Sequence, residues 1–480
     1  MGSRKFILVL CFITIIFFAT SLQLFNEVYR KTNTVIDELF HIRQGKAFCE
    51  QNFTSWDPKI TTLPGLYLVT SLYNSLGIAC NTYNLRFINL IGSCINLLLF
   101  ATLLKFTYGS VLSSQTQIVL QALNFAFLPP LYFFSFVYYT DTLSLMFLLL
   151  FTISCVVFKS KGLVFVFGLS SVMMRQTNVL WVAMVLGHKI LDLLIRTSRV
   201  FGNQHLSGLH VGKHSLLAKD IDSSKLKRYY AIQDVFIALR YHLSTCFMTI
   251  FKFLTVSDAI MIVQNLLVLI FFSVFVYVNG SIVVGDKTAH QATIHLPQLF
   301  YFLLFYGVFG LPYVLTKLPT TLKLIYTNRI RVILFVIAIL IIVHYNTLAH
   351  PYLLADNRHY TFYIWNRWFG RYVYAKYLLA PVYVFLLFSL YDNLKDQNCV
   401  SFLLPYSICL MLSLALQKLL DIRYFLVPYI ILRLRFVKPS ALLISVEFLW
   451  YLAINFATFY IFFTKEIKWT EFEESQRIIW

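Results

Sequence analysis

Charged residues are scarce in this chain of 480 residues, at 13% of positions, whereas 59% of positions are hydrophobic. A soluble protein of this length would be about half apolar and a quarter charged. Apolar runs of roughly 18 or more residues recur along the whole sequence, and each is long enough to cross a bilayer. The shortage of charge excludes a soluble globular enzyme. The long runs exclude a membrane β-barrel, whose strands are short and alternate in polarity.

Several motifs of enzyme chemistry are also missing. The sequence has no HExxH, no paired CxxC, no glycine-rich phosphate loop and no GxSxG elbow. Its histidines are dispersed, whereas a zinc site needs ligands at tight spacing. The one Asp-x-Asp, Asp220–Asp222, stands in a basic stretch and is interpreted as a solvated turn. We therefore expect neither a metal nor a cofactor.

The net charge is +19, from 40 basic and 21 acidic residues. The basic residues are scattered between the apolar runs, which argues against binding to nucleic acid. This pattern indicates charges that orient the spans and contact membrane lipid. Arg4 and Lys5 precede a first span at about 6–25 and place its start in the cytosol.

The predicted fold class is an all-α polytopic membrane protein with about 11 to 14 transmembrane helices. We expect residues 1–480 to form a single integral domain. Three polar regions are assigned by counting spans: 26–84 as a first luminal region, 188–243 as a basic cytosolic loop and 348–373 as a luminal loop. Cys49 and Cys80 share the first of these, where an oxidising lumen permits a disulfide, but the sequence alone leaves their pairing open.

The densest polar cluster follows an apolar span and is predicted to face the lumen. Between His350 and Lys376 there are four Lys or Arg residues and one Asp, against the positive-inside tendency. Phosphate binding would account for them, because arginine presents a planar fork of donors. The alternative is an interfacial aromatic belt with snorkelling basic side chains. Luminal carboxylates near arginines fit a general base and a cradle for a leaving phosphate, as in glycosyl transfer from a lipid phosphate.

Eight stretches resemble, in order, the dolichyl-phosphate-glucose α-1,2-glucosyltransferase family: "DELFHIRQGKAFCE", "WDPKITTLPGLYL", "LRFINL", "YFFSFVYYTD", "MRQTNVLWV", "HQATIHLPQLFYF", "HPYLLADNRHYTFYIWNR" and "RYFLVPYIILRL". The resemblance implies a GT-C glycosyltransferase architecture in the endoplasmic reticulum membrane, with a luminal active site. It implies dolichyl phosphate glucose as donor and the dolichyl-diphosphate-linked oligosaccharide as acceptor of a terminal glucose. In "LALQKLLDIRYF" the chain departs from the family pattern at Leu416, Asp421 and Ile422, which leaves the role of Asp421 open.

Asp37 and Glu38 are adjacent luminal carboxylates soon after span one, where the resemblance implies the catalytic groups. The resemblance implies a β-linked glucose on the donor phosphate and an α-linked product. One inverting displacement gives that outcome, and it needs a base that deprotonates the acceptor 2-hydroxyl. Asp37 is the expected base and Glu38 the expected sugar- or helix-binding partner. Adjacent residues on a helix point about 100° apart, so we expect only one to face the substrate. The alternative is that one of them merely caps the helix.

The remaining candidates form two groups. Arg358 is the first choice for the donor phosphate, and the expected donor-binding set is Asp356, Asn357, Arg358, His359, Arg367 and Arg371. The expected acceptor-binding set is His41, Trp56, Asp57, Arg175 and Gln176. For "RQTN" (175–178), which breaks an apolar run, the alternative is a satisfied polar pair between helices.

A different class of protein is a non-enzymatic one, such as a transporter or a channel-associated subunit. A transporter places ionisable residues near the bilayer midplane on broken helices. Only Arg175 stands beside such a break. The polar clusters are instead predicted to lie together at the luminal edge of the membrane and to line one cavity there: 37–65, 138–141, 175–178, 285–295 and 350–371. The sequence therefore favours an enzyme with its active site on the luminal side.

Overall fold

The computed structural model describes residues 2–32, 34–108, 115–158, 162–207, 232–245, 248–287, 292–395, 400–436, 439–469 and 475–480. These residues are mostly helical, and their one sheet is a pair of two-residue antiparallel strands. Both findings agree with the all-α architecture predicted from the apolar runs.

Seven helical segments in the described ranges are long and apolar enough to cross a membrane. They are α1 (Gly2–Lys31), α4 (Thr82–Tyr108), α9 (Asn178–Ser207), α12 (Val256–Asn279), α16 (Arg329–Asn346), α19 (Ala375–Leu378) with α20 (Ala380–Leu394), and α23 (Ala441–Thr464). Four shorter apolar segments accompany them: α7 (Asp141–Ile153) with η1 (Ser154–Phe158), α8 (Leu163–Met174), α13 (Pro297–Phe309) and α21 (Val400–Leu414). The number of crossings stays a prediction, because length and composition alone define these candidates.

Short helices connect or extend these segments. They are α2 (Glu38–Cys49), α3 (Gly65–Ser75), α5 (Gln115–Ala126), α6 (Pro129–Phe134), α10 (Ile232–Ser244), α11 (Ile250–Phe253), α14 (Leu311–Thr316), α15 (Leu318–Thr327), α17 (Pro351–Ala355), α18 (Tyr360–Ile364), η2 (Trp365–Phe369), η3 (Ile422–Phe425) and α22 (Leu426–Arg433). The strands are β1 (Glu466–Ile467) and β2 (Gln476–Arg477). Proline explains the start of several, since it lacks a backbone N–H and suits the first turn of a helix. Pro129, Pro297 and Pro312 take that place in α6, α13 and α14.

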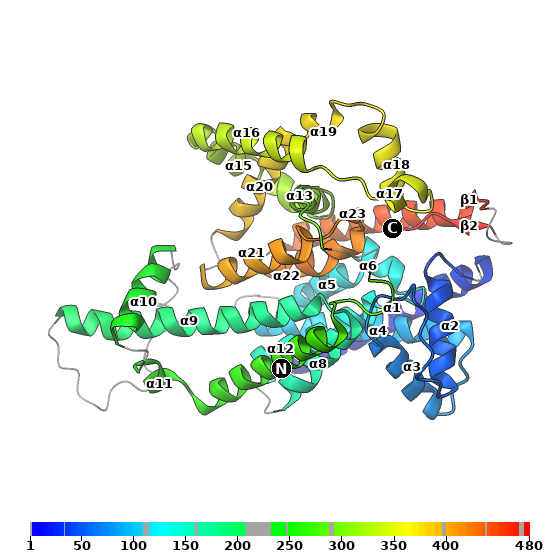
Figure 1. Ribbon diagram of the computed structural model, residues 1–480, viewed down its shortest axis with the longest axis horizontal. Helices are drawn as coiled ribbons and strands as arrows, with labels where there is room; N and C mark the ends of the chain where they lie inside the picture. The colour runs from blue at the N-terminus through cyan, green and yellow to red at the C-terminus, as the bar shows by residue number, and fades with distance from the viewer. Residues whose placement is uncertain are drawn as a thin grey trace.

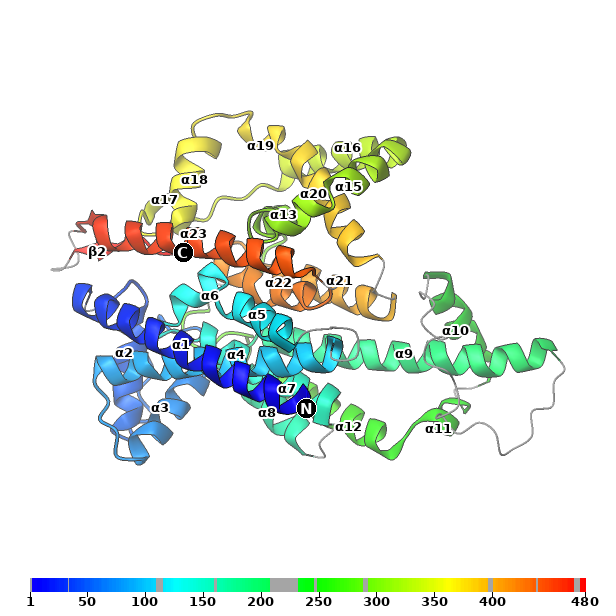
Figure 2. The ribbon, with the colours of Figure 1, turned by 180° about the vertical axis from the view of Figure 1, so that it is seen from behind.

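The two ends of the molecule differ in character. Helices α2, α3, α17 and α18 and the strands gather at one end, whereas α10, α11 and the far part of α9 lie at the other (Figures 1 and 2). The polar stretches predicted to face one side of the membrane are therefore collected at one end.

Backbone contacts fasten the loop before α3 to the segment after α12. The amides of Val284 and Asp286 donate to the carbonyls of Thr61 and Pro58, at 3.2 and 2.8 Å. Gly285 has φ +71°, and a Cβ there would meet the Pro58 carbonyl at 2.5 Å, so only glycine fits this crossing. Stretches predicted to share one side thus touch directly. Residues 288–291 of the polar stretch 285–295 lie outside the described residues.

A disulfide joins Cys49 at the end of α2 to Cys80, with the two Cα atoms 6.5 Å apart. The sequence had left this pairing open. The cross-link ties α2 and α3 to the start of α4, and it fits the oxidising compartment expected for this region.

The expected cytosolic loop 188–243 proves to be largely helical where it is described. Helix α9 continues from the apolar span through this region to Ser207, and α10 packs back against it. The extension carries an i,i+4 ion pair between Asp192 and Arg196, a spacing that supports helix rather than loop. Residues 208–231 lie outside the described residues.

Candidate functional site

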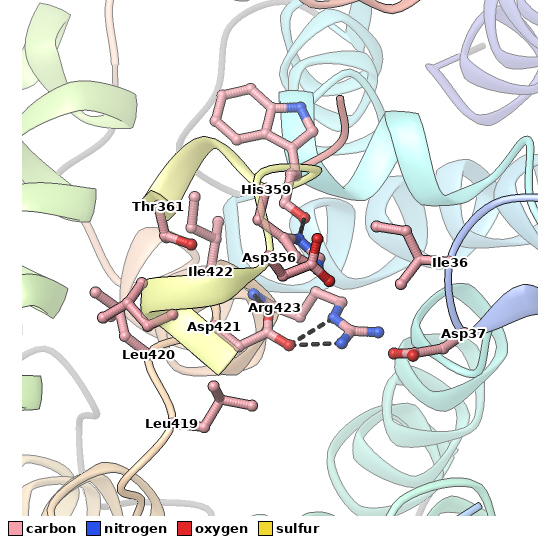
Figure 3. A pocket seen from close by; sticks show the side chains of 12 residues that line it. Ile36, Asp37, Asp356, His359, Thr361, Leu419, Leu420, Asp421, Ile422 and Arg423 are labelled. Atoms are coloured by element: carbon pink, nitrogen blue, oxygen red, sulfur yellow. Dashed lines mark hydrogen bonds and ion pairs between the residues drawn. The ribbon is translucent and has the colours of Figure 1, made fainter. Parts of the chain in front are cut away.

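The end of the molecule that contains α2, α17 and α18 has a cavity of about 100 Å³, several times the volume that one water molecule needs. Four segments far apart in the sequence line it (Figure 3). The lining residues are Ile36, Asp37, Leu353, Asp356, His359, Thr361, Leu419, Leu420, Asp421, Ile422, Arg423 and Trp480. Three aspartates, one arginine and one histidine are among them, in a wall otherwise rich in apolar side chains.

Asp37 stands immediately before α2, in the N-cap position, yet its side chain makes no capping hydrogen bond. The carboxylate projects into the cavity (Figure 3). The preceding Ile36 has φ +43°, a left-handed conformation that is strained for a β-branched residue. Such strain typically costs about 1–3 kcal/mol and clusters at functional sites. Because the Asp37 side chain makes no capping hydrogen bond, the helix-capping alternative does not apply to Asp37.

Glu38 turns the other way. Its two oxygens accept hydrogen bonds from Nε and Nη2 of Arg86, both at 2.7 Å, and from the backbone amides of Val35 and Tyr138. Both charged side chains are 0% exposed. Glu38 thus joins α2 to α4 and to the segment before α7, and it does not line the cavity.

The cavity region contains three Asp–Arg ion pairs. Asp356 pairs with Arg358, Asp421 pairs with Arg423, and Asp141 at the start of α7 pairs with Arg175. Asp37 is different, because no ion pair or hydrogen bond to its carboxylate is found among the described residues. It is the aspartate in this group whose oxygens remain available to a ligand.

Ion pairing fixes the charge of two of these carboxylates. Burial by itself would raise the pKa of Asp421, but the ion pair and hydrogen bonds from Arg423 outweigh it and hold that pKa below its usual value. The pKa of Asp356 is lowered in the same way, by Arg358 and His359 against the effect of burial. Both carboxylates are ionised at neutral pH.

The stretch 356–359 forms part of the wall, but its four residues have different roles. Asp356 and His359 line the cavity. Arg358 gives Nε and Nη2 to the two oxygens of Asp356, both at 2.8 Å, and its guanidinium lies 4.1 Å from the centroid of the Trp469 ring. Asn357 accepts a hydrogen bond from Nε1 of Trp469. Arg358, which was expected to bind the donor phosphate, therefore already uses Nε and Nη2 to bind the carboxylate of Asp356.

Arg367 and Arg371, the other expected donor ligands, are exposed. Their guanidinium groups lie 5.1 and 5.7 Å from the ring centroids of Tyr363 and Tyr372. Neither lines the cavity. Their surroundings resemble the interfacial aromatic belt that the sequence offered as the alternative.

The expected acceptor residues divide into two places. His41 lies one turn along α2 from Asp37, and its Nδ1 is 2.6 Å from the Tyr67 hydroxyl. Burial lowers the pKa of His41 to about 4, so the imidazole is neutral at pH 7. Trp56 packs on Phe48 and Tyr67, and Asp57 accepts from the amide of Lys59. These three acceptor candidates belong to α2 and the loop between α2 and α3, and none of them lines the cavity.

Arg175 and Gln176 occupy the predicted break between α8 and α9, and the structure confirms that break. Gln176 donates from Nε2 to the carbonyl of Thr61 at 2.6 Å, which ties the break to the loop before α3. Arg175 lines a second, smaller hollow of about 20 Å³, which also touches Arg423 and Tyr424.

Most of the cavity residues were not among the expected site residues, and the two with the largest chemical consequence are Arg423 and Trp480. Arg423 belongs to "RYFLVPYIILRL", a stretch that carried the family resemblance, so its motif was recognised but its role was not. Backbone contacts of the C-terminal residues place Trp480 at the cavity. The Ile479 amide donates to the Arg358 carbonyl at 2.8 Å, and His359 Nδ1 is 3.1 Å from the Trp480 carbonyl. No sequence pattern announces that contact, because it joins segments about 120 residues apart.

No group of three or more His, Cys, Asp or Glu side chains in the described ranges is placed to hold a metal ion. The cavity chemistry therefore consists of one unpaired carboxylate, paired carboxylates, an arginine and a histidine, beside a set of membrane-spanning helices.

Helical spans with a polar cavity at one end describe a polytopic membrane protein, and the carboxylates and arginine of the cavity agree with the GT-C glycosyltransferase architecture that the family resemblance implies. The model of the DIE2/ALG10 family matches residues 31–434. The chain belongs to this family.

Full-length relatives support that assignment. The chain is 40% identical to "Dol-P-Glc:Glc(2)Man(9)GlcNAc(2)-PP-Dol alpha-1,2-glucosyltransferase" of Drosophila melanogaster, over 100% of both chains. A human relative with the same name is 36% identical and covers 96% of this chain and 97% of its own. One from Arabidopsis thaliana is 32% identical, over 93% and 94%. No solved structure matches the chain.

Proposed function

We propose that this protein transfers glucose from dolichyl phosphate glucose to the glycan of Glc(2)Man(9)GlcNAc(2)-PP-Dol, forming a terminal α-1,2 bond. The proposal rests on the names of its full-length relatives and on one structural observation. That observation is the unpaired carboxylate of Asp37, which shares a cavity with the Asp421–Arg423 pair.

Asp37 acts as the general base of a single inverting displacement. Its oxygens take the proton from the 2-hydroxyl of the acceptor glucose as that oxygen attacks the anomeric carbon. A positioned base typically contributes about 10²–10⁴-fold to the rate. Glu38 is unsuited to this step, because its oxygens are engaged by Arg86 and by two backbone amides.

The wall formed by Asp356, His359 and Thr361 meets the donor glucose. An ionised Asp356 accepts hydrogen bonds from sugar hydroxyls while Arg358 fixes its orientation. Trp56 and Asp57, on the α2–α3 side, contact the acceptor glycan by stacking and hydrogen bonding. His41, one turn along α2, is neutral at pH 7 and therefore adds no positive charge near Asp37.

The active site faces the lumen of the endoplasmic reticulum. Arg4 and Lys5 favour a cytosolic N-terminus by the positive-inside rule. Residues 475–480 pair with the 356–361 stretch, so the end of the described chain lies on the same side as the cavity. An odd number of crossings satisfies both conditions.

The proposal is tested in cells that lack the endogenous activity. Expression of the wild-type chain is expected to add one hexose to their truncated lipid-linked oligosaccharide, seen by mass spectrometry of the released glycan. Asp37→Asn, which keeps the shape of the side chain and removes its basicity, is expected to add none while being produced at the wild-type level. Wild-type protein in the membrane without the added hexose would refute the assigned activity.

A further inference from the structure

The side chain of Arg423 has one edge available to a ligand. Its Nε and Nη2 both donate to a single oxygen of Asp421, Oδ2, at 2.8 and 2.6 Å. The other oxygen, Oδ1, accepts from the backbone amide of Arg423 itself. No hydrogen bond from Nη1 is found in the part of the chain that the structure describes. One nitrogen of the fork therefore has a hydrogen-bonding position open on the cavity.

The guanidinium plane is held firmly in that orientation. It lies 5.5 Å from the ring centroid of Phe134 and 5.3 Å from that of Tyr139, distances typical of cation–π contact. Figure 3 shows the group between the carboxylates of Asp421 and Asp37, which enter the cavity from different segments. Arg423 also lines the smaller hollow that contains Arg175, so it forms the partition between the two spaces.

The other arginines near the site offer less. Arg358 places its fork on both oxygens of Asp356 and lies over Trp469, and it does not line the cavity. Arg367 and Arg371 are exposed. Arg423 is the arginine that shares the cavity with Asp37.

We infer that Arg423, rather than Arg358, holds the phosphate of the polyprenyl-phosphate sugar donor. This assignment rests on the glucosyl transfer proposed above. Nη1 donates to a non-bridging phosphate oxygen, and the charge of Arg423 stabilises the negative charge that grows on the leaving group. Asp421 is a positioning residue, because it fixes the guanidinium through its carboxylate.

The transfer is a single displacement at the anomeric carbon. The acceptor oxygen forms a bond to the anomeric carbon of glucose while the bond from that carbon to the phosphate oxygen breaks. The electron pair of the broken bond stays on the phosphate beside Arg423, and the hydroxyl proton goes to Asp37. The products are the α-glucoside and the free polyprenyl phosphate.

The test uses purified full-length protein in lipid nanodiscs, with dolichyl phosphate as the probe and binding measured directly as a Kd. Arg423→Lys keeps the charge beside Asp421 but lacks the fork. The double variant D421N/R423Q removes both charges, so that neither is left buried without its partner. Arg30→Gln is the matched control. It also removes one arginine from an ion pair, but this pair, with Glu27, is exposed and lies outside the cavity.

Loss of a charge-assisted hydrogen bond is expected to raise the Kd for dolichyl phosphate roughly 10- to 100-fold in Arg423→Lys and in the double variant. The donor KM is expected to rise with it, whereas Arg30→Gln stays within about twofold of wild type on the same scale. Wild-type Kd values in both Arg423 variants, in protein that still elutes as a folded species, would overturn the inference. If wild-type protein binds the probe through Arg423 but transfers no glucose, the proposed activity fails and the phosphate site stands.

Discussion

Asp37 and Glu38 are adjacent carboxylates with opposite surroundings, one lining the cavity and one held in a buried ion pair. Exchanging each for its amide tests their proposed roles separately. In Glu38→Gln the side chain keeps its size but loses its charge. The buried Arg86 then loses its carboxylate partner, because both side chains are 0% exposed and Glu38 accepts the hydrogen bonds from its Nε and Nη2. Breaking a buried ion pair in this way costs about 3–5 kcal/mol.

The amide also has a hydrogen-bonding conflict. Four donors converge on the carboxylate of Glu38: two from Arg86 and the backbone amides of Val35 and Tyr138. An NH₂ group in place of one oxygen points a donor at donors. Glu38→Gln is therefore expected to lower the thermal midpoint and the yield of folded protein, whereas the activity of each folded molecule changes much less.

Asp37→Asn is expected to do the reverse. The Asp37 carboxylate has no ion pair among the described residues, so its loss leaves stability near the wild-type value, while kcat falls by about 10²–10⁴. Thermal unfolding of the detergent-solubilised protein and glucose transfer per folded molecule are measured side by side. A Glu38→Gln variant with wild-type midpoint and no activity, together with an active Asp37→Asn, would show that the two roles are reversed.

Three further outcomes follow from particular contacts. Replacing Cys49 and Cys80 by serine removes a cross-link between residues 31 positions apart, and the chain-entropy model gives a loss of about 4 kcal/mol in the free energy of unfolding. The thermal midpoint of the non-reduced variant should fall to that of reduced wild type. Burial lowers the pKa of His41 to about 4, so the unfolded chain binds the extra proton first. Stability contributed by neutral His41 is full above pH 6.5 and is lost towards pH 4, by up to about 3 kcal/mol, and His41→Gln should flatten a plot of thermal midpoint against pH. Arg175→Ala should raise the acceptor KM more than the donor KM in initial-rate kinetics; a larger effect on the donor would place Arg175 at the phosphate instead.

Much of the architecture was accessible from the sequence, because hydropathy and charge act locally. The break at 175–178 was predicted from four polar residues inside an apolar run, and it separates α8 from α9. The polar stretches predicted to share a side do contact one another, as Asp286 and Gln176 show by binding the loop 58–61. In a membrane, the cost of burying polar groups in lipid enforces this sorting.

The different directions taken by Asp37 and Glu38 were predictable only in part. The angle of about 100° between neighbours on a helix indicated that one of them would face the substrate. Which one depends on Arg86, nearly fifty residues along the chain, and on the left-handed backbone of Ile36. Neither leaves a signal in the local sequence, since the ion pair is decided by how α4 packs on α2. The same reasoning applies to α9, whose ion-paired extension looked like a basic loop when read by charge alone.

The choice between the two arginines shows where local reading ends. Asp356-Asn-Arg358 and Asp421-Ile-Arg423 share one spacing, and both form an ion pair within the tripeptide. The difference lies in what packs on the guanidinium. Trp469 covers that of Arg358, whereas the rings beside Arg423 leave its Nη1 edge towards the cavity of Asp37. An arginine that is already oriented by a carboxylate but not covered loses little conformational entropy when it binds a phosphate. Tertiary packing, and not the motif, therefore decides which pair stiffens the wall and which meets the substrate.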